Sequence, residues 1–209
     1  MKFYDCATAP SPRRARIMIA EKSLEIETVQ VDLRSGEHLT DAYKAINPNC
    51  TVPTLELDDG TRLHSTVGIW HYLEAAYPET PMMGTTAEEK GRIADLQWRV
   101  EMDGLMAVGE ALRNGAPAMK DRALTGPHNY AQLPELVERG KIRVERFLDG
   151  VEEMIGDKPF AAGDTFSIAD IDLLVVVDFA KWLKLELPES ATRARAWHER
   201  VSARPSAKL

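Results

Sequence analysis

The chain has 209 residues, a length that predicts one large domain or two small ones. Its 26 Lys and Arg against 33 Asp and Glu give a net charge of -7. An acidic chain of this kind is not typical of proteins that bind nucleic acid or anionic membranes, because both partners need clustered basic side chains. With 44% hydrophobic and 28% charged residues, the composition excludes disordered, collagen-like and coiled-coil proteins.

Short strand patterns alternate with helical patterns over the first 80 residues. We predict a strand at 1–6, a helix at 13–22 after a proline-rich loop, a strand at 27–33 and a short helix at 39–45 that ends before Asn47-Pro48. Strands at 53–57 and 61–63 flank Asp58-Asp59-Gly60, which is a strong hairpin signal. A helix at 65–77 completes the order β-α-β-α-β-β-α, so we predict an α/β domain over residues 1–80.

Helical periodicity dominates after a connector at residues 81–84. We predict a long helix at 86–114, a Gly- and Pro-containing loop at 114–130, and helices at 133–154, from 167 onward, and at 191–201. Ser167 followed by Asp170 predicts a capping box, which we interpret as a folding element without a chemical role. These patterns predict an all-α second domain over residues 86–209.

Cysteine and histidine usage indicates the compartment and the absence of a metal site. Two cysteines, Cys6 and Cys50, are too few for a disulfide framework and fit a reducing compartment. The longest purely aliphatic stretch, at 173–177, is too short to span a membrane, and the first residues contain no signal-like apolar run. The five histidines lack zinc-ligand spacing, and no glycine-rich phosphate loop occurs. We therefore predict a cytoplasmic protein that binds no metal, membrane or nucleic acid.

Three arginines, Arg13, Arg14 and Arg16, lie at the start of the first predicted helix. A helix N-terminus favours anions, so these arginines could form an anion site. A charge run of this kind more often forms a solvated helix face with salt bridges, and we favour that interpretation.

The stretch from Asn47 to Leu73 holds two features with chemical potential. Val52-Pro53 begins a strand, where proline is unusual, and a cis bond there would direct the Val52 N–H and C=O outward to pair with an extended peptide. Ser65 precedes the next helix, where its hydroxyl and backbone N–H could bind a carboxylate. Taken singly, the two features are typical of an edge-strand proline and an ordinary helix cap.

Together these residues form a pattern that resembles the cytosolic glutathione transferases. The sequence reads NPxxxVPxLxxxDGxxLxSxxxIxxYL over 47–73, GDxFSIADIxL over 163–173 and AWxxRVxARPS over 196–206. The resemblance implies a thioredoxin-like glutathione-binding domain over 1–80 and an all-helical domain over 86–209 that supplies the hydrophobic substrate side. It also implies a homodimer, with glutathione as the cosubstrate.

The resemblance also implies roles for individual residues. Val52 and Pro53 match the backbone clamp for the cysteinyl part of glutathione, and Ser65 matches the serine that holds the γ-glutamyl carboxylate. His38 lies where several members place a polar side chain against the glycyl carboxylate. We include Cys50, two residues before Val52, among the predicted glutathione-binding residues.

His64 departs from the family pattern. Members usually carry Glu, Asp or Gln at this position, and the acidic forms neutralise the γ-glutamyl ammonium. A histidine cannot neutralise an ammonium, and a protonated histidine would repel it at contact range. His64 therefore brings the expected affinity for glutathione into question.

The first loop departs from the pattern too, since Ala9 occupies the place of the catalytic serine or cysteine. A thiol with a pKa of about 8.5 needs a donor near sulfur to ionise at neutral pH. Ser11 is our first candidate donor, Thr8 the second and Tyr4 the third, although Ser11 could equally be a plain helix cap. We interpret Cys6 as a buried small hydrophobe and not as a nucleophile.

These observations predict a detoxifying glutathione transferase that joins the thiolate to a hydrophobic electrophile. Trp98, Met102, Leu105 and Met106 could line its apolar side, although such a stripe is also typical of a core. Two alternatives stay open: a binding protein that has lost catalysis, suggested by Ala9 and His64, and a glutathione-dependent isomerase or ether-cleaving enzyme. A redox thiol enzyme is disfavoured, because Ala9 stands where it would need cysteine.

Overall fold

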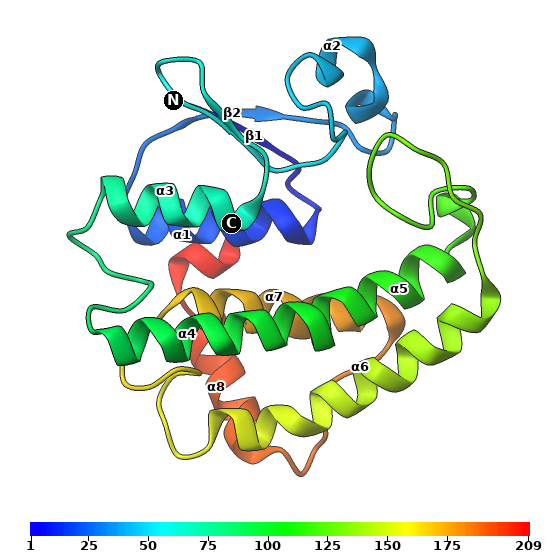
Figure 1. Ribbon diagram of the computed structural model, residues 1–209. Helices are drawn as coiled ribbons and strands as arrows, with labels where there is room; N and C mark the ends of the chain where they lie inside the picture. The colour runs from blue at the N-terminus through cyan, green and yellow to red at the C-terminus, as the bar shows by residue number, and fades with distance from the viewer. The chain divides into compact units, whose positions relative to one another are not determined.

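The computed structural model describes residues 1–209, which form two compact units (Figure 1). The first unit contains Met1–Thr80, Leu124–His128 and Leu209, and the second contains Pro81–Ala123 and Asn129–Lys208. None of the helices combines the length and the apolar character needed to cross a membrane.

A four-stranded mixed sheet forms the centre of the first unit. Its strands are β1 (Lys2–Asp5), β2 (Glu27–Gln30), β3 (Thr54–Glu56) and β4 (Arg62–Leu63), in the order β2-β1-β3-β4. β1 runs parallel to β2 and antiparallel to β3, so that Phe3 lies opposite both Thr28 and Leu55. The helices α1 (Pro10–Glu21) and α3 (Thr66–Ala76) pack side by side against the sheet (Figure 1). This arrangement confirms the predicted thioredoxin-like element order.

The first helix begins three residues earlier than predicted. Ala9 is its N-cap, and Pro10 and Pro12 lie in its first turn. Proline is tolerated there because the first N–H groups of a helix have no intrahelical partner to lose. Ser11 therefore lies within the first turn of α1, and the interpretation of Ser11 as a helix cap is wrong.

The second strand and the short helix are also shorter than predicted. β2 ends at Gln30, and the chain then turns at Asp32, whose carboxylate accepts the N–H groups of Arg34 at 2.9 Å and Ser35 at 3.2 Å. Such an Asx turn competes with continued strand pairing. The predicted helix at 39–45 divides into a 3-10 turn, Glu37–Leu39, and α2 (Asp41–Lys44).

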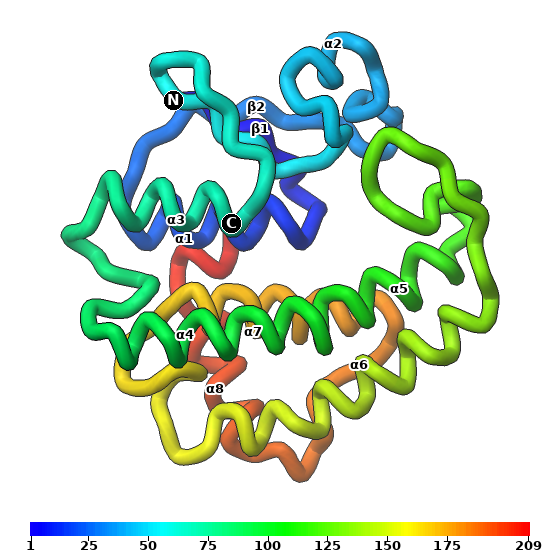
Figure 2. Tube along the Cα trace, viewed as in Figure 1, coloured from blue at the N-terminus to red at the C-terminus, as the bar shows by residue number.

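The second unit consists of helices, as predicted. Its long elements are α4 (Ala87–Arg99), α5 (Met106–Gly115), α6 (Pro134–Ile155), α7 (Ile168–Ala180) and α8 (Thr192–Ser202). Almost every residue of α7 is buried, so this helix forms the centre of the unit. The chain reverses direction between α5 and α6, which pack against each other (Figure 2).

The helix predicted at 86–114 is not uniform. A π-helical segment, Val100–Leu105, separates α4 from α5. At Gly104 a Cβ atom would lie 2.7 Å from Val176 Cγ1 and 2.8 Å from Phe147 Cζ, so only glycine permits this approach to α7 and α6. Hydrophobic periodicity does not reveal one wide turn within a long helix.

Candidate functional site

The loop before β3 is shaped by buried side chains. The amide of Asn47 donates to Thr51 O at 2.7 Å and to Thr54 Oγ1 at 3.1 Å, and its Oδ1 accepts the N–H of Asn49 at 2.9 Å. The hydroxyl of Tyr43 donates to the same Thr51 carbonyl at 2.8 Å. Because the loop side chains satisfy these polar groups internally, the backbone that follows is held in one conformation.

That backbone contains a cis peptide bond between Val52 and Pro53. Val52 is half-buried and Pro53 is buried. Cys50 has a positive φ of 52°, and its buried thiol donates to Pro48 O at 3.7 Å. The Cys50 side chain therefore contributes to the shape of the loop and is not presented on its surface.

Ser65 is the N-cap of α3, as predicted. Its exposed hydroxyl oxygen accepts the N–H of Gly68 at 3.0 Å, which leaves the hydroxyl hydrogen available to donate. The first turn of α3 contains no acidic residue, so no side chain of that turn neutralises the positive end of the helix. This end of α3 is chemically suited to a carboxylate.

His64 lies half-buried beside this cap, with Nδ1 3.5 Å from Thr54 Oγ1. Burial lowers the pKa of His64 below its ordinary value, and the positive charge of Arg62 lowers it further. Arg62 itself pairs with Glu56 at 2.6 Å. The lowered pKa makes His64 neutral at pH 7, so it does not repel an ammonium group there.

The three candidate donors occupy different surroundings. Thr8 is exposed, with its hydroxyl 3.6 Å from Cys6 Sγ, and Ser11 is half-buried, with its hydroxyl accepting from Arg14 Nη2 at 3.4 Å. Tyr4 is buried, and its ring packs edge-on against Tyr43 at 6.3 Å.

Contacts between α1 and α3 bring Ser11 and Ser65 to the same end of this helix pair. Thr66 Oγ1 donates to Ser11 O at 3.3 Å, and Trp70 Nε1 donates to Arg14 O at 3.3 Å. Arg14 is buried over the Trp70 ring, 5.8 Å from its centroid. The prediction of a solvated arginine face is therefore wrong for Arg14, whose charge is stabilised by an aromatic ring.

His38 lies in the turn Glu37–Leu39, between β2 and α2, and is half-buried. The turn is held by Glu37, whose carboxylate accepts the N–H of Asp32 at 2.6 Å. His38 therefore lies in a different loop from Val52, which precedes β3, and from Ser65, which precedes α3.

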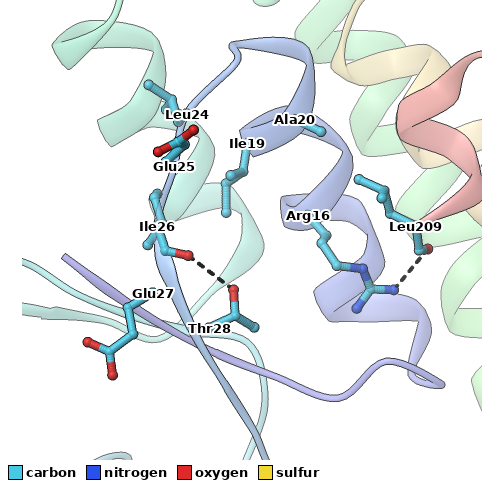
Figure 3. Close-up of a pocket in the computed structure, with 9 residues that line it drawn as sticks. All are labelled: Arg16, Ile19, Ala20, Leu24, Glu25, Ile26, Glu27, Thr28 and Leu209. Atoms are coloured by element: carbon cyan, nitrogen blue, oxygen red, sulfur yellow. Dashed lines mark hydrogen bonds between the residues drawn. The ribbon is translucent and has the colours of Figure 1, made fainter.

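A groove of about 550 Å³ lies between α1 and the segment that leads into β2 (Figure 3). It contains none of the predicted glutathione-binding or donor residues. Its lining residues are Arg16, Ile19, Ala20, Leu24, Glu25, Ile26, Glu27, Thr28 and Leu209. No group of three or more His, Cys, Asp or Glu side chains is arranged to hold a metal ion.

The structure also brings a distant segment of the chain near the loop that precedes β3, a proximity that the sequence analysis did not predict. Leu124–His128, within the predicted loop at 114–130, is grouped with the first unit. Gly126 is buried there, and a Cβ atom on it would lie 3.8 Å from Asn49 O. Gly and Pro content predicts a loop but does not indicate where the loop lies.

The apolar stripe of the second unit is exposed. Trp98 is 60% exposed, Met102 41% and Met106 53%, while Leu105 is half-buried. The interpretation of this stripe as core is therefore wrong for the three exposed residues, which form an apolar surface along α4, the π-helical segment and α5.

Comparisons with known proteins agree with this architecture. The family model of the glutathione S-transferase N-terminal domain matches residues 8–76, and that of the C-terminal domain matches residues 134–200. The chain is 34% identical to glutathione S-transferase 2 of Saccharomyces cerevisiae, over 100% of this chain and 88% of that protein. It is 29% identical to maleylacetoacetate isomerase of Pseudomonas aeruginosa, over 83% of this chain and 78% of that protein. The crystal structure of Gtt2 from Saccharomyces cerevisiae matches with a TM-score of 0.89 and 33% identity, covering 100% of this chain and 99% of that one.

Proposed function

The chain belongs to the glutathione S-transferase family and is a glutathione transferase, and from this premise we propose that it joins the thiolate of glutathione to a hydrophobic electrophile. The observation that carries the proposal is the first turn of α3, where the exposed Ser65 hydroxyl and a helix N-terminus with no acidic residue in its first turn suit a carboxylate. The contact of Thr66 with Ser11 O joins this turn to the start of α1.

Each end of glutathione has a proposed partner. Ser65 binds the γ-glutamyl carboxylate, and the Val52 N–H and C=O pair with the cysteinyl backbone next to Pro53. His38 binds the glycyl carboxylate. Cys50 acts through the shape of the loop, since its thiol is turned inward. His64, neutral at pH 7, contacts the γ-glutamyl group without repelling its ammonium.

Glutathione supplies the nucleophilic sulfur, and the protein stabilises its ionised form. The thiol proton passes to solvent, and the sulfur then forms a bond to the electrophilic carbon as the leaving group departs. Ser11 is the first candidate donor to the thiolate, because its hydroxyl lies in the first turn of α1. Thr8 is the second candidate, and the buried Tyr4 is the third.

The electrophile side is proposed on the exposed stripe of Trp98, Met102 and Met106, together with Leu105. Apolar, adaptable side chains suit hydrophobic electrophiles of varied shape. We also expect a homodimer, and exposed apolar surface of this kind is available for self-association. Analytical ultracentrifugation measures that association directly.

A glutathione-dependent isomerase is the second candidate function, favoured by the similarity to maleylacetoacetate isomerase. In an isomerisation the sulfur adds to the substrate and then leaves it, so that glutathione is not consumed. A conjugation reaction consumes one glutathione for each product. Quantifying free thiol over a complete reaction distinguishes these two functions.

The Ser11→Ala variant tests the thiolate donor. We expect the apparent pKa of the bound thiol to rise by about one unit and turnover to fall about tenfold, with little change in KM for glutathione. Ser190→Ala, at an exposed position of the second unit, is the control. An unchanged pH–rate profile in Ser11→Ala would exclude Ser11 as the donor and direct attention to Thr8.

A further inference from the structure

Ala7, two residues before the N-cap of α1, has both backbone polar groups held by side chains. Its N–H donates to Gln30 Oε1 at 2.9 Å, and its carbonyl accepts from Arg16 Nη2 at 3.1 Å. Gln30 ends β2, and Arg16 lies in α1. The peptide units on both sides of Ala7 are therefore clamped from two different elements.

Both clamping side chains are anchored on one buried carboxylate. Asp5, the last residue of β1, is 1% exposed, and its Oδ1 accepts from Arg16 Nη1 at 2.5 Å. Its Oδ2 accepts from Gln30 Nε2 at 2.8 Å. Each oxygen of the carboxylate thus orients one of the two side chains that hold Ala7, and the four hydrogen bonds close a ring.

The ring fixes the path of the chain into the loop that carries the candidate donors. Ala9, the N-cap of α1, donates its N–H to Cys6 O at 2.9 Å, so a turn closes around Ala7 and Thr8. Only Thr8 and the N-cap Ala9 lie between the clamped Ala7 and the first residue of α1. A displacement of Ala7 would therefore move Thr8 and the first turn of α1 with it.

Arg16 has one further contact, to Leu209 O at 3.4 Å, and both residues line the groove of about 550 Å³ (Figure 3). That bond is longer than the bonds to Asp5 and Ala7, so the guanidinium is oriented mainly by the ring. A buried ion pair is weak evidence for stability, because desolvation offsets much of its Coulombic gain. The Asp5–Arg16 pair is better explained by the position in which Arg16 holds the Ala7 carbonyl.

We propose that Asp5 is a positioning residue of the transferase reaction. It holds the Ala7 peptide units through Gln30 and Arg16, so that Thr8 and the first turn of α1 with Ser11 present their hydroxyl groups to the glutathione sulfur. This inference rests on the proposed function. Asp5 does not contact glutathione in this scheme. Its loss therefore affects turnover and thiol ionisation, while binding through Val52 and Ser65 is preserved.

The Gln30→Ala variant tests the inference with little risk to folding, because Gln30 is exposed on the edge strand β2. We expect kcat to fall roughly ten- to a hundredfold, as misplaced catalytic groups do, with KM for glutathione nearly unchanged. The apparent pKa of the bound thiol rises in parallel. Thr28→Ala, an exposed position two residues earlier on the same strand, is the matched control and leaves all three quantities unchanged.

A double substitution provides a rescue. Gln30→Glu places a second carboxylate against Asp5, and Asp5→Asn removes the charge that orients Arg16, so each change alone lowers kcat. Combined, the new amide donates to the new carboxylate, whose second oxygen still accepts the Ala7 N–H. The amide oxygen at position 5 still accepts from Arg16, and one negative charge stays in the ring, now at position 30. We expect the double variant to recover most of the wild-type kcat, which would show that the contact between positions 5 and 30, and not either side chain alone, supports turnover.

Hydrogen exchange of the Ala7 amide gives a readout that does not depend on activity. We expect the amide, which donates to Gln30 Oε1, to exchange slowly in the wild type and faster in Gln30→Ala. If the wild type binds and conjugates glutathione but Gln30→Ala retains its kcat and thiol pKa, the positioning role is overturned while the proposed function stands. If the wild type neither binds nor conjugates glutathione, the proposed function fails, and the positioning role fails with it even where exchange shows the Ala7 clamp intact.

Discussion

Two helices of this protein begin at a serine cap, yet their first turns differ. At α7 the capping box is present: Asp170 Oδ2 accepts the Ser167 N–H at 3.0 Å and the Ser167 hydroxyl at 3.2 Å. At α3 the third residue after Ser65 is Gly68, which has no carboxylate to reach back to the cap. The same type of cap is therefore closed internally in one unit and left open in the other.

Burial follows the same division. Ser167 and Asp170 are buried, and Asp170 Oδ1 also accepts from Ala161 N and Trp197 Nε1, both at 2.8 Å. Burial raises the pKa of the Asp170 carboxyl above its ordinary value, while its donors act to lower it. Ser65 is exposed. A helix N-terminus that completes its hydrogen bonds within the protein serves folding, whereas one left incomplete at the surface is available to a ligand.

Removing the internal carboxylate should have the largest effect. Asp170→Ala leaves its buried donors without an acceptor, so we expect the free energy of unfolding to fall by about 3–5 kcal/mol. Urea denaturation measures this loss. Asp164→Ala, at an exposed position of the same segment, is the control and should change stability by less than about 0.5 kcal/mol.

Removing the open cap should affect binding more than folding. In Ser65→Ala we expect KM for glutathione to rise roughly ten- to a hundredfold, since a hydrogen bond to a charged group contributes about 1.5–3 kcal/mol. The lost cap should lower the free energy of unfolding by only about 1 kcal/mol. In Ser167→Ala we expect the free energy of unfolding to fall while KM for glutathione stays near the wild-type value. A similar rise in KM in both variants would show that the exposed cap at Ser65 has no special role in binding.

The pH dependence of binding should report His64. Because burial lowers the pKa of His64 below its ordinary value, the ring becomes charged only as the solution is made acidic, and it then repels the γ-glutamyl ammonium. Between pH 7.5 and pH 5 we expect the affinity for S-methylglutathione, which has no ionisable thiol, to fall about fivefold, or about 1 kcal/mol. Calorimetry measures this change, and it should disappear in His64→Gln.

The smallest effect should come from Gly68. A Cβ atom there would lie 3.0 Å from Ser65 Oγ, so Gly68→Ala must displace the hydroxyl by a few tenths of an ångström. We expect KM for glutathione to rise about threefold, while alanine adds about 0.5–1 kcal/mol of helix stability. Thermal unfolding and initial-rate measurements check the two effects separately. An unchanged KM would show that binding does not depend on the exact place of the hydroxyl.

The fold and the Ser65 cap could be predicted from the sequence because their signals are local. Ser65 stands directly before an apolar helical pattern, and Asp58-Asp59-Gly60 marks the hairpin before it. The start of α1 differs from the prediction because Pro10 and Pro12 are typical of loops, although both also fit a first helical turn.

Features that depend on packing were not predictable in this way. The ring of Asp5, Arg16 and Gln30 joins three elements, and its pairing depends on the register of β1 with β2. Within the π-helical segment, Gly104 meets side chains of α6 and α7 at a distance that leaves no room for a Cβ atom. Long-range contacts of this kind leave no periodic pattern in the sequence.

The carboxylate site at the N-terminus of α3 is tested most directly by a calorimetric titration of glutathione into the wild type, Ser65→Ala and Ser167→Ala at pH 7.5. We expect measurable binding to the wild type, binding weakened roughly ten- to a hundredfold in Ser65→Ala, and near-wild-type affinity in folded Ser167→Ala. Equal affinity in the wild type and Ser65→Ala would contradict the assignment of the open N-terminus of α3 as the carboxylate site.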